Sequence, residues 1–153
     1  PMSGDVSPHF SRHEFDLSDE KARKRGLDAG AEYPAEWIES RLTPLCAALE
    51  VIRAEFGGKP VRVISGYRPL DYNRALGSED TSQHVQGRAA DFQIDGVAPG
   101  VVYRRVLELH QLGRIEIGGI GVYDEFNHID VRGGAMATWD ERKATQRLSA
   151  GSR

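Results

Sequence analysis

Apolar residues repeat at helical spacing along residues 34–56, and this is the most regular pattern in the chain. Their intervals of three and four residues place them on one stripe of an α-helix. Pro44 interrupts the stripe, so either the helix kinks there or a second helix starts with Thr43 as its N-cap. Gly57 and Gly58 end the helix. The repeating positions are Ile38, Leu42, Leu45, Leu49, Ile52 and Phe56.

After this helix the pattern changes to short runs of β-branched and alternating residues. Such runs, bounded by glycine or proline, are typical of strands. A further helix is expected from Pro99 to about Leu112, with Val102, Val106 and Leu109 on its inner face. The expected strands are residues 61–65, 89–94, 118–123 and 127–131, and residues 71–76 are expected to form a short helical turn.

The segments outside these elements are polar. Residues 1–8 are expected to be loose, and residues 141–153 are expected to form a frayed tail. Residues 16–33 are charged and contain two glycines, which predicts little helix. The whole pattern predicts one α+β domain over residues 9–140, with N-terminal helices packed on a mostly antiparallel sheet.

Composition narrows the possible classes of protein. The chain has 153 residues, of which 39% are hydrophobic and 28% charged, as expected for a globular domain with its own core. A net charge of −3 gives no basic surface for nucleic acid. Cys46 is the only cysteine, so the chain has no internal disulfide and no thiolate-rich zinc site. No membrane span and no signal peptide are visible, and a monomer is expected.

The stretch from Ser82 to Asp91 carries the candidate chemistry. Gly87 breaks it, so a loop carrying His84 is expected to run into a strand carrying Asp91. Taken alone, this pair would be an ordinary surface histidine and a turn aspartate. A neutral imidazole and a carboxylate directed at one point are, however, typical ligands of zinc. His128, which follows the predicted hairpin turn, is the natural third ligand.

Three motifs are informative in combination: Ser65-Gly66-Tyr67-Arg68, then Ser82-x-His84-x-x-Gly87-x-Ala89-x-Asp91, then His128-x-Asp130. Their order and spacing resemble the zinc D-alanyl-D-alanine carboxypeptidase family. That family includes bacterial cell-wall carboxypeptidases, vancomycin-resistance dipeptidases and phage endolysins that cut L-Ala-D-Glu bonds, and it shares its fold with the hedgehog signalling domain. The resemblance covers about residues 9–140. It implies a zinc peptidase that acts on peptidoglycan or muropeptides.

The resemblance also implies roles for single residues. His84, Asp91 and His128 become the ligands of one zinc ion per chain, which leaves a position for water. The family's general base stands three residues before the last histidine, and here that residue is Glu125. Asp124 is close enough to compete for the role.

Further residues are expected around the metal. Arg68 is expected to bind a substrate carboxylate or the oxyanion. Asp130 shares a strand face with His128, so it is a candidate to orient that ligand or to bind substrate. Ser82 is expected to support the ligands as a hydrogen-bond partner. Tyr67, Asn73 and Gln83 are expected to line the site.

One position departs from part of the family. Some relatives carry a further histidine two residues before the last ligand, where this chain has Phe126. Stabilisation of the transition state would then depend more on Arg68.

Three classes of function fit two histidines and a carboxylate. A peptidoglycan peptidase is favoured, because Glu125 and Arg68 have no use in a purely structural zinc site. A non-haem iron oxygenase uses the same ligands, but it needs a double-sheet barrel for which the predicted helices leave too little room. An inactive zinc-binding module is the third class. Cleavage at a chain end and cleavage within a peptide stay equally open. The protein is expected to be made in a bacterial cytoplasm, with or without phage infection, and to reach the cell wall after release or export.

Overall fold

The computed structural model describes residues 4–143. It confirms a single α+β domain, in which helices pack on a five-stranded, mostly antiparallel sheet with strand order β1-β2-β4-β3-β5. Three of the four strand pairs are antiparallel, and β5 pairs with β3 in parallel. The strands are β1 (Val61–Ser65), β2 (Ala89–Ile94), β3 (Gly119–Val122), β4 (Asn127–Asp130) and β5 (Ala137–Asp140).

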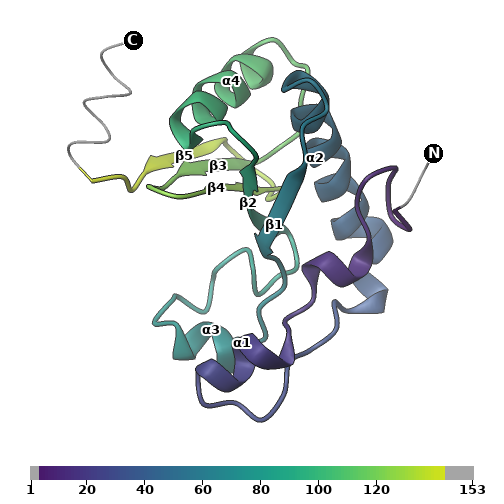
Figure 1. Ribbon diagram of the computed structural model, residues 1–153, viewed down its shortest axis with the longest axis vertical. Coiled ribbons are helices and arrows are strands. Elements are labelled where there is room, and N and C mark those ends of the chain that lie inside the picture. The colour runs from purple at the N-terminus through teal and green to yellow at the C-terminus, as the bar shows by residue number, and fades with distance from the viewer. Residues whose placement is uncertain (1–3, 144–153) are drawn as a thin grey trace.

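Within residues 4–143, four α-helices accompany the sheet, and Figure 1 shows their arrangement. They are α1 (Asp19–Lys24), α2 (Thr43–Glu55), α3 (Leu70–Ala75) and α4 (Pro99–Gln111). Short helical turns occupy Arg12–Phe15, Ala35–Trp37 and Ile38–Leu42, the last with π-helical bonding. None of the helices in the described part of the chain is long and apolar enough to cross a bilayer.

The predicted long helix is one apolar stripe, but its start differs from both alternatives. The π-helical turn Ile38–Leu42 leads directly into α2, and Leu42 rather than Thr43 is the N-cap residue. Pro44 is accommodated in the first turn of α2, where the missing amide proton has no intrahelical partner to lose. The wider π turn thus lets the chain continue past the proline.

The expectation of little helix over residues 16–33 is wrong, because α1 lies there. Ser18 is its N-cap, and the hydroxyl accepts a hydrogen bond from the amide of Lys21. Only Ala22 of this six-residue helix is buried. A single buried residue produces no apolar repeat, so the periodic pattern could not reveal α1.

The strand β5 was also absent from the predicted elements. It is short, and none of its residues is fully buried. It forms because β3 offers it a parallel edge, and such pairing between segments far apart leaves no local signal. Residues 144–153, most of the expected frayed tail, lie outside the described residues.

The first described residues are held to the domain by Glu50 of α2. This carboxylate accepts hydrogen bonds from the Ser7 hydroxyl and from the His9 amide, both at 2.7 Å. The amides of Val6 and Ser7 both donate to the carbonyl of Phe10, whose side chain is buried in the main core. Burial at Phe10 and charge at Glu50 together fix residues 6–10.

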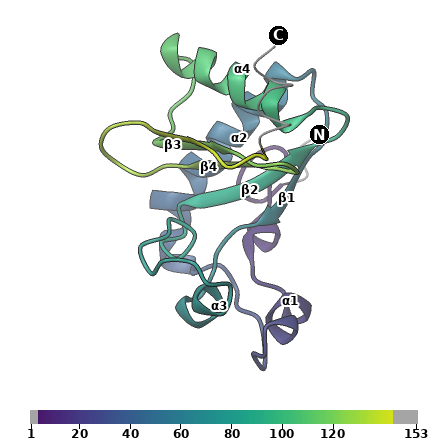
Figure 2. The same ribbon diagram turned by 90° about the vertical axis from the view of Figure 1, so that its left-hand side faces the viewer.

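The two faces of the sheet differ in character. One face carries the apolar side chains of β2, β3 and β4, including Phe92, Ile120 and Ile129, all fully buried in the main core. The helices α2 and α4 cover this face, while α1 and α3 lie at the far end of the molecule (Figures 1 and 2). The helices α1 and α3 share a small separate core built from Leu17, Ala22 and Tyr72. The opposite face of the sheet is left for polar residues.

A single row of residues crosses all five strands on that polar face. Its members are paired strand to strand in the order Ser65, Asp91, His128, Gly121 and Trp139. The pairing of β1 with β2 shifts register between Val63 and Ser65. Such a bulge turns the following side chain to the other face, so Ser65 joins the row although Val63 faces the core.

Candidate metal centre

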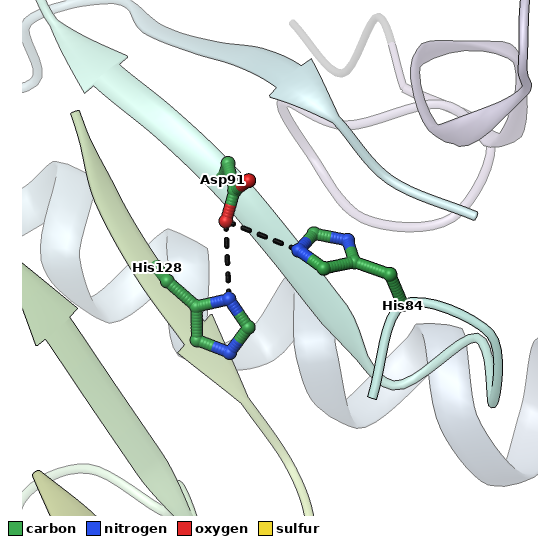
Figure 3. Close-up of side chains that lie close together, drawn as sticks. All are labelled: His84, Asp91 and His128. Atoms are coloured by element: carbon green, nitrogen blue, oxygen red, sulfur yellow. Dashed lines mark hydrogen bonds and ion pairs between the residues drawn. The ribbon is translucent and has the colours of Figure 1, made fainter. Parts of the chain in front are cut away.

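Two imidazoles and one carboxylate converge on the polar face of the sheet. Asp91 comes from β2, His128 from the neighbouring strand β4, and His84 from the loop before β2. Figure 3 shows both rings directed at the same carboxylate oxygen. The Asp91 Oδ1 atom lies 3.1 Å from His84 Nε2 and 3.0 Å from His128 Nδ1. All three side chains are buried, and their ligand atoms lie within 4.8 Å of one another.

In both histidines, the ring nitrogen that faces away from Asp91 already makes a hydrogen bond. His84 Nδ1 lies 2.8 Å from the carbonyl oxygen of Gly66, which can only accept a hydrogen bond. His84 Nδ1 therefore carries the proton, and Nε2 presents its lone pair to Asp91. His128 Nε2 lies 2.7 Å from Asp130 Oδ2, so its Nδ1 presents a lone pair when the ring is neutral.

When both rings are neutral, three lone pairs meet at one point, an arrangement that needs a cation to stabilise it. Burial lowers the pKa of His84, which keeps this ring neutral. Burial opposes protonation of His128 too, but the hydrogen bonds to Asp130 and Asp91 outweigh it and raise the pKa of His128. The donor set of two nitrogens and one carboxylate oxygen is one that zinc binds with three protein ligands. The residues therefore fit the ion.

Charged partners fix the two aspartates. Arg68 Nη2 lies 3.2 Å from Asp91 Oδ2, which leaves Oδ1 free to face the histidines. Arg132 donates two hydrogen bonds to Asp130, from Nε to Oδ1 at 2.8 Å and from Nη2 to Oδ2 at 2.7 Å. Burial would raise the pKa of Asp130, but the hydrogen bonds from Arg132 and His128 lower it well below the usual range. Asp130 is therefore ionised and can only accept the proton of His128.

The loop that carries His84 is held by hydrogen bonds and by close packing. The His84 carbonyl accepts the Arg68 amide at 3.1 Å, and the Ser82 hydroxyl accepts the His84 amide at 3.2 Å. Gly87 has a φ of +69°, and a Cβ there would lie 2.6 Å from the Trp37 ring. Only glycine both adopts this turn and lets the loop approach Trp37 so closely.

The histidines and Asp91 line an open pocket of about 470 Å³. Its lining comes mainly from the loop that follows α3, from the β3–β4 turn and from β5. The remaining lining residues are Arg68, Ser78, Glu79, Thr81, Ser82, Gln83, Tyr123, Phe126, Arg132 and Trp139. A substrate can therefore reach the metal-binding atoms from solvent.

A profile of the peptidase M15 family matches residues 8–130, which include every residue of the proposed ligand set. The chain belongs to this family. It is also 34% identical, over 86 residues, to the peptidoglycan L,D-endopeptidase MepK of Escherichia coli K12. A probable peptidoglycan L,D-endopeptidase MepK of Haemophilus influenzae is 33% identical over 84 residues. These matches cover 53% and 52% of this chain, and 44% and 42% of the relatives. The chain thus spans less than half the length of these curated relatives.

Several residues expected around an M15 metal site are found there. Arg68, Ser82 and Gln83 line the pocket, and Asp130 supports His128 from below it. Asn73 is fully buried beneath the pocket wall. Its side chain accepts a hydrogen bond from Arg68 at 3.4 Å and donates one to the Glu79 carbonyl at 2.7 Å.

Three expected residues, Tyr67, Asp124 and Glu125, are not brought to the pocket. Tyr67 packs edge-on against the rings of Tyr33 and Trp37, with centroids 6.1 and 5.9 Å away. Glu125 is exposed at the tip of the β3–β4 turn and lines a different hollow. The reason is that Glu125 stands in the turn, outside β3 and β4, so its distance along the chain from His128 does not place it on the polar face of the sheet. Asp124 binds the amide of Lys143 at 3.0 Å.

Six pocket residues escaped the sequence analysis: Ser78, Glu79, Thr81, Tyr123, Arg132 and Trp139. Tyr123 could have been found by alternation, since it shares a strand face with Gly121, the partner of His128. Trp139 could not, because β5 itself was not predicted. Its ring packs on His128 with centroids 4.9 Å apart.

Proposed function

We propose that this protein is a zinc-dependent peptidase that hydrolyses stem peptides of peptidoglycan, cutting within the peptide at a bond between an L- and a D-residue. The observation that carries the proposal is the convergence of the His84, Asp91 and His128 lone pairs in a pocket open to solvent. Membership of the peptidase M15 family supports peptidase chemistry. The names of the relatives support the substrate and the type of bond.

Cleavage within a peptide is favoured over removal of a terminal residue by the state of Arg68. A carboxypeptidase would need a free guanidinium to grip the terminal carboxylate. Here the guanidinium already bonds Ser65 Oγ at 3.1 Å, Asn73 Oδ1 and Asp91 Oδ2. Arg68 therefore supports the metal ligand Asp91 and is not free to bind a terminal carboxylate. This suits an enzyme that binds a continuous peptide chain.

The chemistry of the site follows from its residues. A zinc ion held by His84, Asp91 and His128 would polarise a carbonyl group and lower the pKa of an attacking water. Asp130 holds the His128 ring in the tautomer that a ligand needs. Arg68 neutralises the second oxygen of Asp91 and adds positive charge where the substrate carbonyl becomes negative.

The attacking water must also lose a proton to a base. Among the described residues, Glu79 is the one carboxylate besides Asp91 that lines the pocket. Its backbone is fixed, because its carbonyl accepts hydrogen bonds from the Asn73 side-chain amide at 2.7 Å and from the Ser82 backbone amide at 3.1 Å. Glu79 is accordingly the proposed base in place of Glu125, and it would return the proton to the leaving amine.

The two other classes of function are less well supported. A non-haem iron oxygenase of the double-sheet type is disfavoured by the single five-stranded sheet. An inactive zinc module has no need for an open pocket beside the ligands. To act on peptidoglycan, the protein would have to reach the cell wall after release or export.

Digestion of purified muropeptides, with mass analysis of the products, tests the proposal. The wild-type protein loaded with zinc should split a stem peptide into two fragments between an L- and a D-residue. His128→Ala should abolish cleavage, whereas His13→Ala, at an exposed histidine, should not. Release of only a terminal D-alanine would make the protein a carboxypeptidase. No cleavage of any muropeptide would contradict the proposed function.

A further inference from the structure

Tyr123 lies beside the metal ligands, yet the proposed mechanism gives it no role. It follows β3 and lines the same pocket as His84, Asp91 and His128. Its ring stacks on Phe126, with centroids 4.4 Å apart and planes 12° from parallel. Its amide bonds the Phe126 carbonyl at 2.9 Å, which closes the β3–β4 turn. The turn therefore holds the phenol rigidly at the edge of the pocket.

The hydroxyl of Tyr123 is anchored in a way that leaves its proton free. Trp139 Nε1 lies 2.9 Å from the hydroxyl oxygen, and an indole N–H can only donate. The phenol is thus the acceptor. Within residues 4–143 its oxygen has no other hydrogen-bond partner, so its own O–H has no acceptor there. Burial raises the pKa of Tyr123, so the phenol keeps this proton at neutral pH.

Trp139 connects this phenol to the metal site. The Trp139 ring packs on the His128 ring. The position of Trp139 depends on Gly121, which pairs with His128 on β4 and with Trp139 on β5. A Cβ at Gly121 would lie 2.3 Å from Trp139 Nε1. Glycine at this point of the cross-sheet row therefore lets the indole lie flat against the sheet. One side chain thus packs on a ligand and positions the Tyr123 oxygen.

We propose that the Tyr123 hydroxyl donates a hydrogen bond to the substrate carbonyl oxygen as it becomes an oxyanion, with Trp139 as the residue that positions it. This inference rests on the proposed peptidase function. In the step concerned, the water oxygen bonds to the carbonyl carbon and the π electrons move to the carbonyl oxygen. The Tyr123 proton stabilises that charge without being transferred. When the C–N bond breaks, the amine takes the proton that the water lost.

The two arginines in the pocket are already bonded to other side chains, so a separate donor to the oxyanion is needed. Arg68 already bonds three side chains, and the Arg132 guanidinium is held by Asp130. A neutral donor that is fixed in place and partly buried stabilises a developing charge at little reorganisation cost. The Ser82 hydroxyl also accepts a hydrogen bond, from the His84 amide at 3.2 Å, but Tyr123 is the pocket hydroxyl that is held by the indole packed on a metal ligand.

The test uses the full chain loaded with zinc, the muropeptide that the digestion identifies, and a phosphinic isostere of its scissile bond. Tyr123→Phe should lower kcat on the order of 10²-fold, with a smaller change in KM. The affinity for the phosphinic isostere, measured by calorimetry, should fall by a similar factor, and the zinc content should stay at the wild-type value. Tyr103→Phe, on α4 and outside the pocket, is the matched control and should change none of these quantities.

Trp139→Phe is the second variant, because it keeps a ring on His128 but removes the N–H that anchors the phenol. It should retain zinc and lose a smaller part of kcat and of isostere affinity. Wild-type values of kcat and isostere affinity in Tyr123→Phe would overturn the proposal. Loss of zinc from Tyr123→Phe would also overturn it, since the role would then be structural. A wild-type protein that cleaves no muropeptide would instead overturn the proposed function beneath it.

Discussion

The Nε2 atom of His128 lies 2.7 Å from Oδ2 of Asp130, while the other nitrogen of the ring lies 3.0 Å from Asp91. Asp130 has no exposed surface, and Arg132 binds both of its oxygens. Asp130, itself held by Arg132, therefore fixes the tautomer and the orientation of the His128 ring. A ring held in this way loses little freedom when it binds an ion.

Asp130→Asn should weaken zinc binding about 10–100-fold, because an amide can present its own N–H to His128 and no longer fixes the tautomer. Competition with a chelator of known affinity measures the change. Asp95→Asn, at an exposed aspartate after β2, is the control and should bind zinc normally. Equal zinc affinity in both variants would remove Asp130 from the support of the metal.

The ligand set predicts one zinc ion per chain. His84→Ala should lose bound zinc, because two remaining ligands and a water do not make a catalytic zinc site. Elemental analysis of the purified wild type and variant gives the stoichiometry. Iron in the wild-type protein, or full zinc content in His84→Ala, would contradict the assignment.

Arg68→Lys should lose activity although the charge is kept. One ammonium group cannot reach the Ser65, Asn73 and Asp91 oxygens that the guanidinium bonds together. Since Arg68 supports a ligand and the charge of the transition state, the loss should appear mainly in kcat. A loss confined to KM would instead indicate that Arg68 binds a substrate carboxylate. Arg62→Lys, at an exposed arginine of β1, should behave as wild type.

Glu79→Gln and Glu125→Gln separate the two candidate bases. Glu79 lines the metal pocket and Glu125 lines another hollow, so only Glu79→Gln should reduce kcat, by about 10²–10⁴-fold. Zinc content should be unchanged in both. A loss confined to Glu125→Gln would return the role to the hairpin turn, as the family pattern implies. If kcat is unchanged in both variants, neither carboxylate is the general base.

Glu50 predicts a dependence of stability on pH. Burial favours the neutral acid, but the hydrogen bonds from Ser7 and His9 outweigh it and lower the pKa of Glu50. A folded-state pKa below the unfolded value stabilises the protein above about pH 4.3, and this contribution is lost as the pH falls through the lowered pKa. Glu50→Gln should therefore reduce the free energy of unfolding by about 1 kcal/mol at neutral pH and less in acid.

Urea denaturation of both proteins between about pH 7 and about pH 3 measures the difference. Glu39→Gln, at an exposed glutamate, is the control and should shift stability little at any pH. A Glu50→Gln deficit that stays constant down to acid would mean that the charge of Glu50 does not anchor the N-terminal segment.

The sequence by itself determined the features that depend on local spacing. The apolar stripe predicted the long helix, and short runs bounded by turn residues predicted β1 to β4. Gly87 between His84 and Asp91 predicted a loop that runs into a strand, and the structure shows that arrangement with a positive φ at the glycine. The three candidate ligands come together because each motif fixes one face of a strand or one turn.

Tertiary structure alone placed Glu79 and Trp139 in the pocket. The position of Trp139 requires the pairing of β5 with β3, a contact between segments that no local pattern records. Glu79 enters the pocket because Asn73 fixes its loop from below, and Glu125 leaves it because the hairpin pairing places its side chain away from His128. Spacing along a strand sets the face of a residue, but only the pairing of strands and the packing of loops sets its neighbours.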